Sequence, residues 1–275
     1  MYDTLIEPRD LAAAAQDGHF RVVDCRFALS DPGYGPRVFD AGHIPGAVYA
    51  DLDRDLAAPP GAGGRHPLPD RRFLTDRLNA WGISNDSQIV VYDDAGGMYA
   101  CRLWWLARWL GHKSVAVLNG GLQAWVDAGH PMNAGVASVP GGNFHAREPL
   151  TRCVDAEAIL AGISAGDGPV LLDARARERF VGEVEPIDAK AGHIPGACCA
   201  PFADNLEDGR FKPADALKER FAAFGNLNAA ACYCGSGVTA THNILAMRVA
   251  GYPEPALYPG SWSEWINDDN RPIEP

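Results

Sequence analysis

Short apolar runs alternate with segments of helical periodicity along most of the chain. Runs that predict buried strands lie at residues 21–24, 88–92, 114–118, 169–172 and 229–233. Patterns that predict helices lie at residues 71–81, 99–110, 122–127, 213–224, 239–250 and 261–266. Strands and helices in alternation form right-handed βαβ units, in which helices cover both faces of a mainly parallel sheet. The expected fold class is therefore α/β.

The two halves of the chain repeat one pattern. The segment Ala41–Ala47, AGHIPGA, recurs letter for letter as Ala191–Ala197. Flanking residues match in the same order: Asp24 with Asp173, Arg26 with Arg175, Tyr92 with Tyr233, Gly120 with Gly260 and Trp125 with Trp265. A repeat of about 150 residues is too long for a solenoid unit. We therefore expect two copies of one domain.

A segment rich in glycine and proline separates the two copies. Residues Asn133 to Pro149 show neither a helical nor a strand period, which is typical of a linker. We expect one domain over residues 1–134, without a catalytic cysteine, and a catalytic domain over residues 150–275.

Charge and composition exclude several classes of function. The 275 residues carry a formal net charge of −11, which disfavours nucleic acid and anionic membrane surfaces as partners. No stretch reaches the roughly 20 apolar residues of a membrane helix, and residues 1–10 lack the order of a secretory signal. Seven cysteines without framework spacing favour the reducing cytoplasm.

A cysteine follows the predicted strand at residues 229–233. Cys234 begins the loop CGSGVT, which leads into the helix predicted at residues 239–250. Ligands of open α/β sheets bind at the carboxyl ends of strands. Inward-pointing backbone N–H groups and a helix N-terminus stabilise an anion there. Such surroundings turn a thiol of pKa about 8.5 into a thiolate and would also stabilise a persulfide.

The remaining cysteines have less favourable positions. We expect Cys232, within the strand, and Cys25, Cys198 and Cys199, at strand-like positions, to be buried in the core. We place Cys101 in a helix and Cys153 at a helix start. The first copy has Asp93 where the second has Cys234, so only the second copy keeps a nucleophile.

Taken together, these motifs resemble the tandem-domain rhodanese family of sulfurtransferases over nearly the whole chain. The two AGHIPGA segments, the Cys234 loop, and the pair GGLQAW (120–125) and GSWSEW (260–265) carry the resemblance. It implies two tandem rhodanese-like domains, an active site at their interface and a persulfide intermediate on the cysteine. His43 and His193 recur in both copies, so we expect them to be structural turn residues.

The loop sequence narrows the resemblance to the 3-mercaptopyruvate sulfurtransferase branch. That resemblance implies a relay of Ser236, His66 and Asp53 beside Cys234, in which a carboxylate steers a histidine that steers a hydroxyl. The remaining residues expected to bind substrate are those of the loop itself, Gly235, Gly237, Val238 and Thr239.

The same resemblance assigns the substrate carboxylate to Arg179, whose planar guanidinium binds carboxylates in pairs of hydrogen bonds. The branch has a second arginine shortly afterwards. This chain has Glu185 and Asp188 in that region instead, and Lys190 is the candidate replacement.

Three other functions are open to comparison. A thiosulfate:cyanide sulfurtransferase is the alternative within the enzyme class. A cysteine phosphatase needs an arginine where Ala240 stands. A rhodanese-like regulatory or interaction module would have lost the thiol that Cys234 retains.

The sequence predicts a small sulfur donor and, as acceptor, cyanide, a small thiol or a protein thiol such as thioredoxin. It contains no metal-ligand cluster or nucleotide loop, so we expect neither a metal nor another cofactor.

Overall fold

Two compact units make up the protein, each built around its own sheet. The computed structural model describes residues 1–14, 18–135 and 139–275. The first unit comprises residues 1–58, 69–150 and 208–211, and the second comprises residues 59–68, 151–207 and 212–275. The short segment Pro59–Leu68 thus belongs to the second unit, although the first half of the sequence contains it.

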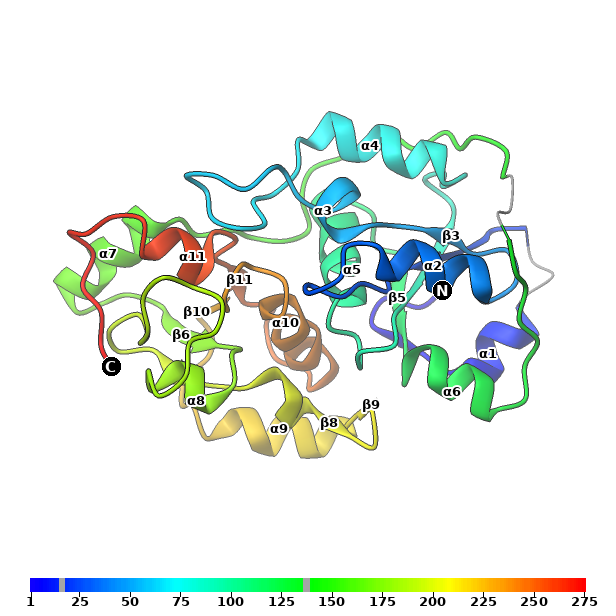
Figure 1. Ribbon diagram of the computed structural model, residues 1–275. Helices are drawn as coiled ribbons and strands as arrows, with labels where there is room; N and C mark the ends of the chain where they lie inside the picture. The colour runs from blue at the N-terminus through cyan, green and yellow to red at the C-terminus, as the bar shows by residue number, and fades with distance from the viewer. Residues whose placement is uncertain (15–17, 136–138) are drawn as a thin grey trace. The chain divides into compact units, whose positions relative to one another are not determined.

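The first unit has a parallel sheet in the order β1-β5-β4-β2-β3, of which Figure 1 labels β3 and β5. Its strands are β1 (Leu5–Ile6), β2 (Phe20–Asp24), β3 (Val48–Tyr49), β4 (Gln88–Tyr92) and β5 (Val115–Leu118). Its helices are α1 (Pro8–Ala13), α2 (Tyr34–Ala41), α3 (Leu52–Asp55), α4 (Arg71–Ala80), α5 (Ala100–Trp109) and α6 (Gly121–Asp127). Every residue of β4 is buried, as expected for a central parallel strand.

The second unit repeats this plan with a parallel sheet in the order β11-β10-β6-β7. Its strands are β6 (Val170–Asp173), β7 (Cys198–Cys199), β10 (Ala230–Tyr233) and β11 (Ala256–Leu257). Its helices are α7 (Ala156–Ala165), α8 (Arg177–Phe180), α9 (Ala214–Ala222), α10 (Ala240–Val249) and α11 (Ser261–Trp265). A 3-10 helix, η1 (Phe202–Asn205), precedes β8 (Leu206–Glu207), and β9 (Arg210–Phe211) clusters with the first unit. The α/β prediction is confirmed.

The repeated sequence motifs have a structural cause. In the first unit Tyr92 donates a hydrogen bond to Asp24 at 2.7 Å, and its hydroxyl accepts one from the N–H of Ile44 at 3.2 Å. Arg26 bonds the same carboxylate and the carbonyl of Gly42. These bonds fasten the AGHIPGA turn to the carboxyl ends of β2 and β4.

The equivalent bonds recur in the second unit. The N–H of Ile194 donates to the hydroxyl of Tyr233 at 3.2 Å, and Arg175 bonds both Asp173 and the carbonyl of Gly192. Because Asp173 pairs with Tyr233 across β6 and β10, the motif marks the sheet edge at which Cys234 begins its loop.

The two motif histidines pack in the same way in both units. The ring of His43 stacks on Phe39 and its Nδ1 lies 2.8 Å from the carbonyl oxygen of that residue. The ring of His193 stacks on Phe180 and its Nδ1 lies 2.9 Å from the Phe180 carbonyl. These contacts are the structural role expected for both.

Two of the expectations for cysteines are wrong. Cys153 is exposed and forms an isolated bridge with Leu257, because α7 begins only at Ala156. Cys198 and Cys199 do form a strand, but β7 is an edge strand and leaves both partly exposed. Cys25 and Cys232 are buried as expected, and Cys101 lies within α5, in a helix as expected.

The segment expected to be a linker is ordered where the structure describes it. Residues 133–135 and 139–149 contain no helix or strand, whereas residues 136–138 lie outside the described part of the chain. Asn133 pairs with His43, and Phe144 is buried with its N–H bonded to Asn79. The segment therefore packs against the first unit.

Candidate active site

Cys234 lies at the carboxyl end of β10, where a short loop leads directly into α10 (Figure 1). The residue is 2% exposed. Its N–H donates to the hydroxyl of Ser261 at 3.1 Å, and its carbonyl accepts from the N–H of Trp262 at 3.0 Å. The next carbonyl, of Gly235, accepts from the N–H of Ser263 at 2.9 Å. The start of α11 therefore holds the backbone on both sides of the thiol.

The loop is shaped to receive an anion. Gly237 has φ +73°, and a Cβ there would lie 2.2 Å from the carbonyl oxygen of Pro259, so only glycine fits. Within the described residues, no acceptor bonds the N–H groups of Ser236, Val238 or Thr239. Thr239 stands immediately before α10, whose N-terminus favours negative charge.

In the first unit, the side chain of Asp93 fills the equivalent loop. Asp93 is fully buried, and its carboxylate accepts four backbone hydrogen bonds of 2.8–2.9 Å, from Ala95, Gly97, Tyr99 and Ala100. Burial raises the pKa of Asp93, and the four N–H groups partly offset that rise. A carboxylate thus occupies the N–H cradle that the second unit presents beside a thiol.

A histidine and a serine meet beside Cys234. The Nδ1 atom of His66 lies 2.7 Å from the hydroxyl oxygen of Ser236, and both side chains are buried. Which of the two donates depends on the histidine tautomer. The two residues are 170 positions apart in the sequence. The structure therefore brings together two of the three members of the relay that the resemblance implies.

The segment Pro59–Leu68 carries His66 into the second unit and is held there by α11. The N–H of Arg65 donates to the hydroxyl of Ser263 at 3.0 Å. A Cβ on Gly64 would lie 2.7 Å from the carbonyl oxygen of Gly260, so the two backbones are in close contact. The GSWSEW segment therefore positions both the cysteine loop and the histidine segment.

Two arginines reach the loop beside the cysteine. A Cβ built on Gly235 would lie 3.0 Å from Nη2 of Arg65 and 3.5 Å from Nη1 of Arg179. The loop CGSGVT contains no cationic residue, but the guanidinium groups of these two arginines, which belong to other segments, lie close to it.

Two carboxylates, Glu185 and Asp188, pair with these arginines. Arg179 forms hydrogen bonds with Glu185 at 2.7–3.1 Å and with Asp188 at 2.9 Å. Asp188 also accepts from Arg65. Lys190, the candidate replacement for the missing arginine, pairs instead with the exposed Asp269 at 2.6 Å.

Asp53, the third member of the expected relay, belongs to the first unit. It lies in α3, and its N–H donates to the side chain of Asp51 at 3.1 Å. Partial desolvation and the negative charge of Asp51 raise the pKa of Asp53. Its partnership with His66 remains a prediction.

The neighbouring thiols differ from Cys234 in their surroundings. Burial, with the charge of Cys234, raises the pKa of Cys232, and burial likewise raises the pKa of Cys25 and Cys101. All seven cysteines are free. Thiols with raised pKa values are poor nucleophiles at neutral pH, which argues against Cys232, Cys25 and Cys101. Cys234 is the candidate because of its position at the end of β10, in the loop that leads into α10.

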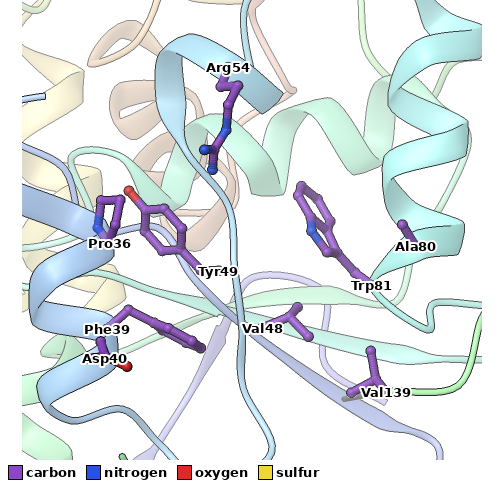
Figure 2. Close-up of a pocket in the computed structure, with 9 residues that line it drawn as sticks. All are labelled: Pro36, Phe39, Asp40, Val48, Tyr49, Arg54, Ala80, Trp81 and Val139. Carbon is purple, nitrogen blue, oxygen red and sulfur yellow. The ribbon is translucent and has the colours of Figure 1, made fainter. Parts of the chain in front are cut away.

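Other features of the described residues offer less chemistry. A cavity of about 390 Å³ in the first unit is lined by apolar and aromatic side chains such as Phe39, Val48 and Trp81, with Asp40 and Arg54 as its charged members (Figure 2). It has no cysteine, histidine or serine in its lining. Over residues 1–14, 18–135 and 139–275, no three His, Cys, Asp or Glu side chains gather to hold a metal ion. No helix in these ranges has the length and apolar character to span a bilayer.

Four residues of this site were not predicted from the sequence: Arg65, Asp188 as a partner of the arginines, Ser261 and Ser263. The signals were present but weak. Arg65 directly precedes His66, and both serines lie in the GSWSEW segment that carries the family resemblance. Their contacts span up to 198 positions, so no local pattern reveals them.

A thiol in a loop of backbone N–H groups, with a serine–histidine pair and two arginines, is the arrangement expected of a cysteine-dependent group-transfer site. The sequence profile of the rhodanese-like domain matches residues 7–128 and 155–268. The chain belongs to the tandem rhodanese-domain family of sulfurtransferases.

Similar proteins cover nearly the whole chain. A "Probable 3-mercaptopyruvate sulfurtransferase" of Pseudomonas aeruginosa is 51% identical over 98% of this chain and 97% of its own length. A thiosulfate sulfurtransferase of Mus musculus is 33% identical over 97% of this chain and 93% of its own length. The solved 3-mercaptopyruvate sulfurtransferase of Leishmania major superposes with a TM-score of 0.86 at 30% identity, covering 98% of this chain and 76% of that one.

Proposed function

We propose that this sulfurtransferase takes its sulfur from 3-mercaptopyruvate and carries it as a persulfide on Cys234. The observation that supports this most directly is the 2.7 Å contact of His66 with Ser236 in the loop of Cys234. When 3-mercaptopyruvate gives up its sulfur, the remaining carbon fragment leaves as a carbanion and needs a proton source beside the nucleophile. The serine–histidine pair is a suitable proton source. The 51% identical relative with that activity in its name supports the same donor.

The first half-reaction conserves atoms and charge without any added reagent. The Cys234 thiolate attacks the sulfur of the donor, and a sulfur–sulfur bond forms. The carbon–sulfur bond of the donor breaks, and its electron pair stays on the carbon as the enolate of pyruvate. The proton of the donor thiol reaches that carbon, so that pyruvate and a persulfide anion on Cys234 are formed.

We assign this proton transfer to Ser236 and His66, whose side chains lie 2.7 Å apart. The serine hydroxyl gives its proton to the enolate carbon and is reprotonated through the imidazole, which takes up the proton of the donor thiol. In the proposed relay Asp53 stabilises the protonated imidazole. The N–H groups of the loop and the start of α10 stabilise the persulfide anion.

The arginines bind the other end of the donor. Arg179 and Arg65 present N–H groups over Gly235, where the carboxylate of 3-mercaptopyruvate can accept them. The loop residues Gly235, Gly237, Val238 and Thr239 then surround the sulfur. In the second half-reaction a thiol or cyanide attacks the outer sulfur, and the Cys234 thiolate leaves.

Thiosulfate is the second candidate donor, and one observation favours it. Two guanidinium groups lie near the cysteine loop, and arginines are common ligands of anions of this kind. The relative from Mus musculus is a thiosulfate sulfurtransferase. With thiosulfate, sulfite leaves with the bonding electrons and no carbon has to be protonated.

Steady-state kinetics with the two donors test the proposal. We expect a higher kcat/KM for 3-mercaptopyruvate than for thiosulfate when one acceptor and one pH are used. Mass spectrometry after donor treatment should find one additional sulfur on the peptide that contains Cys234. Full transfer activity in Cys234→Ser would refute the persulfide mechanism, whereas a preference for thiosulfate would refute only the choice of donor. Cys153→Ser, at an exposed position, is the matched control.

A further inference from the structure

The arginines over Gly235 are already neutralised by the protein itself. Asp188 lies between them: one carboxylate oxygen accepts from Arg65 and the other accepts from Arg179 at 2.9 Å. The side chain of Asp188 is 3% exposed, whereas those of Arg65 and Arg179 are 21% and 17% exposed. In this ion-pair cluster the carboxylate of Asp188 is therefore buried, whereas the two guanidinium groups remain partly accessible.

Glu185 adds a second negative charge behind Arg179. It bonds Nε and Nη2 of Arg179 and lies 3.5 Å from Arg175, whose main partner is Asp173. Burial acts to raise the pKa of Glu185, but the hydrogen bonds from Arg179 and from two backbone N–H groups outweigh it and lower the pKa. Glu185 is therefore ionised at neutral pH.

Charge balance follows from these contacts. The cluster contains three arginines and three carboxylates, so its formal charge is zero. Its members are Arg65, Arg175, Arg179, Asp173, Glu185 and Asp188. An anion that binds over Gly235 can accept hydrogen bonds from these guanidinium groups, but the cluster offers it no net positive charge. Such a site suits one negative charge better than two, because the cost of lost hydration grows more steeply than the charge itself and no net positive charge offsets it.

We propose that Asp188 determines donor specificity: by neutralising Arg65 and Arg179 it restricts the site over Gly235 to donors that bring one negative charge to it. This inference rests on the proposed function, since it assumes that the donor is bound beside Cys234. It explains how two arginines lie beside the nucleophile without making the site selective for a dianion such as thiosulfate.

The substitution Asp188→Asn tests this directly. It keeps the size of the side chain and removes one negative charge. The energy gained with the uncompensated guanidinium is twice as large for a dianion as for a monoanion, so the fold-changes are related as a square. If kcat/KM for 3-mercaptopyruvate rises about 3-fold, that for thiosulfate should rise about 10-fold. The ratio of the two values should therefore shift toward thiosulfate, less so at high ionic strength.

A second variant separates charge from misfolding. The double substitution Arg65→Gln with Asp188→Asn returns the cluster to zero charge, and the donor ratio should return toward that of the unchanged protein. Asp269→Asn removes the same charge from an exposed position that pairs with Lys190, and it should leave the ratio unchanged. An unchanged ratio in Asp188→Asn, or a ratio that the double substitution fails to restore, would overturn the inference.

The state of Cys234 distinguishes this inference from the proposed function. If the unchanged protein forms the Cys234 persulfide and Asp188→Asn leaves the donor ratio unaltered, only the role of Asp188 is refuted. If neither donor places sulfur on Cys234 in the unchanged protein, the proposed function fails and the inference fails with it.

Discussion

The hydroxyl of Ser261 accepts a hydrogen bond from the backbone N–H of Cys234 at 3.1 Å and donates one to the carbonyl of Tyr258 at 2.9 Å. Ser261 is fully buried and has φ +54°, a left-handed conformation that costs a residue other than glycine about 1–3 kcal/mol. The first unit has Gly121 at the equivalent position, with φ +60°. The second unit thus keeps a strained serine where the first unit, whose equivalent loop begins with Asp93, has glycine, and the serine fixes the N–H of Cys234.

We predict that Ser261→Ala is less stable than Ser261→Gly, by about 1 kcal/mol, because alanine keeps the left-handed strain and glycine relieves it. Both variants lose the hydrogen bond to Cys234, so both should form the persulfide more slowly. Urea unfolding measures the first effect, and the rate of sulfur uptake measures the second. A glycine variant with unaltered uptake would show that the hydroxyl does not position the thiol.

Ser236→Ala and His66→Gln should lower kcat with 3-mercaptopyruvate by about 100-fold, the usual size of a general acid–base contribution. The same variants should affect thiosulfate much less, since sulfite leaves without a proton being delivered to carbon. Parallel assays with the two donors check this difference. Equal losses with both donors would assign the pair a structural role.

Asp53→Asn tests whether the first unit contributes to the reaction. If Asp53 steers His66, the variant should lose activity with 3-mercaptopyruvate by about 10-fold or more. Asp86→Asn, at an exposed position of the same unit, provides a control with the same change in charge. Equal activity in the two variants would remove Asp53 from the relay.

Asp93→Ala should destabilise the first unit, because it leaves four buried backbone N–H groups without their acceptor. The loss in unfolding free energy should be about 3 kcal/mol at neutral pH, reduced by the cost of burying the carboxylate. Thermal or urea unfolding measures it, and Asp86→Ala is the exposed control. A loss within 0.5 kcal/mol, which is about the effect of an ordinary surface substitution, would contradict the role assigned to the carboxylate.

Stability should fall at acid pH through Glu185. The pKa of this carboxyl is lower in the folded protein than its ordinary value of 4.5. The resulting stabilisation is fully present above that value and is lost as the pH falls through the lowered folded-state pKa. Glu185→Gln should therefore flatten the decrease of unfolding free energy below about pH 4.5. Urea unfolding at several pH values, with the exposed Glu219→Gln as control, measures the slope.

Much of the fold could be predicted from the sequence. The apolar run at residues 88–92 coincides with β4, and the pattern at residues 239–250 contains α10. Strands and long helices leave strong local patterns: a parallel strand covered on both faces gives a continuous apolar run, and a helix repeats its buried positions about every 3.6 residues. The two-residue strands β1, β3 and β11 were not predicted individually, since two residues show no period.

The sequence by itself determined that the chain contains two copies of one domain and that Cys234 begins a loop after a buried strand. Both follow from local patterns and from a comparison of the chain with itself. Only the tertiary structure decided which side chains surround the thiol. His66 meets Ser236 across 170 positions and Arg65 meets Asp188 across 123, because the irregular segment Pro59–Leu68 packs against α11. Contacts of that separation depend on how whole elements pack, and short stretches of sequence carry no periodic signal for them.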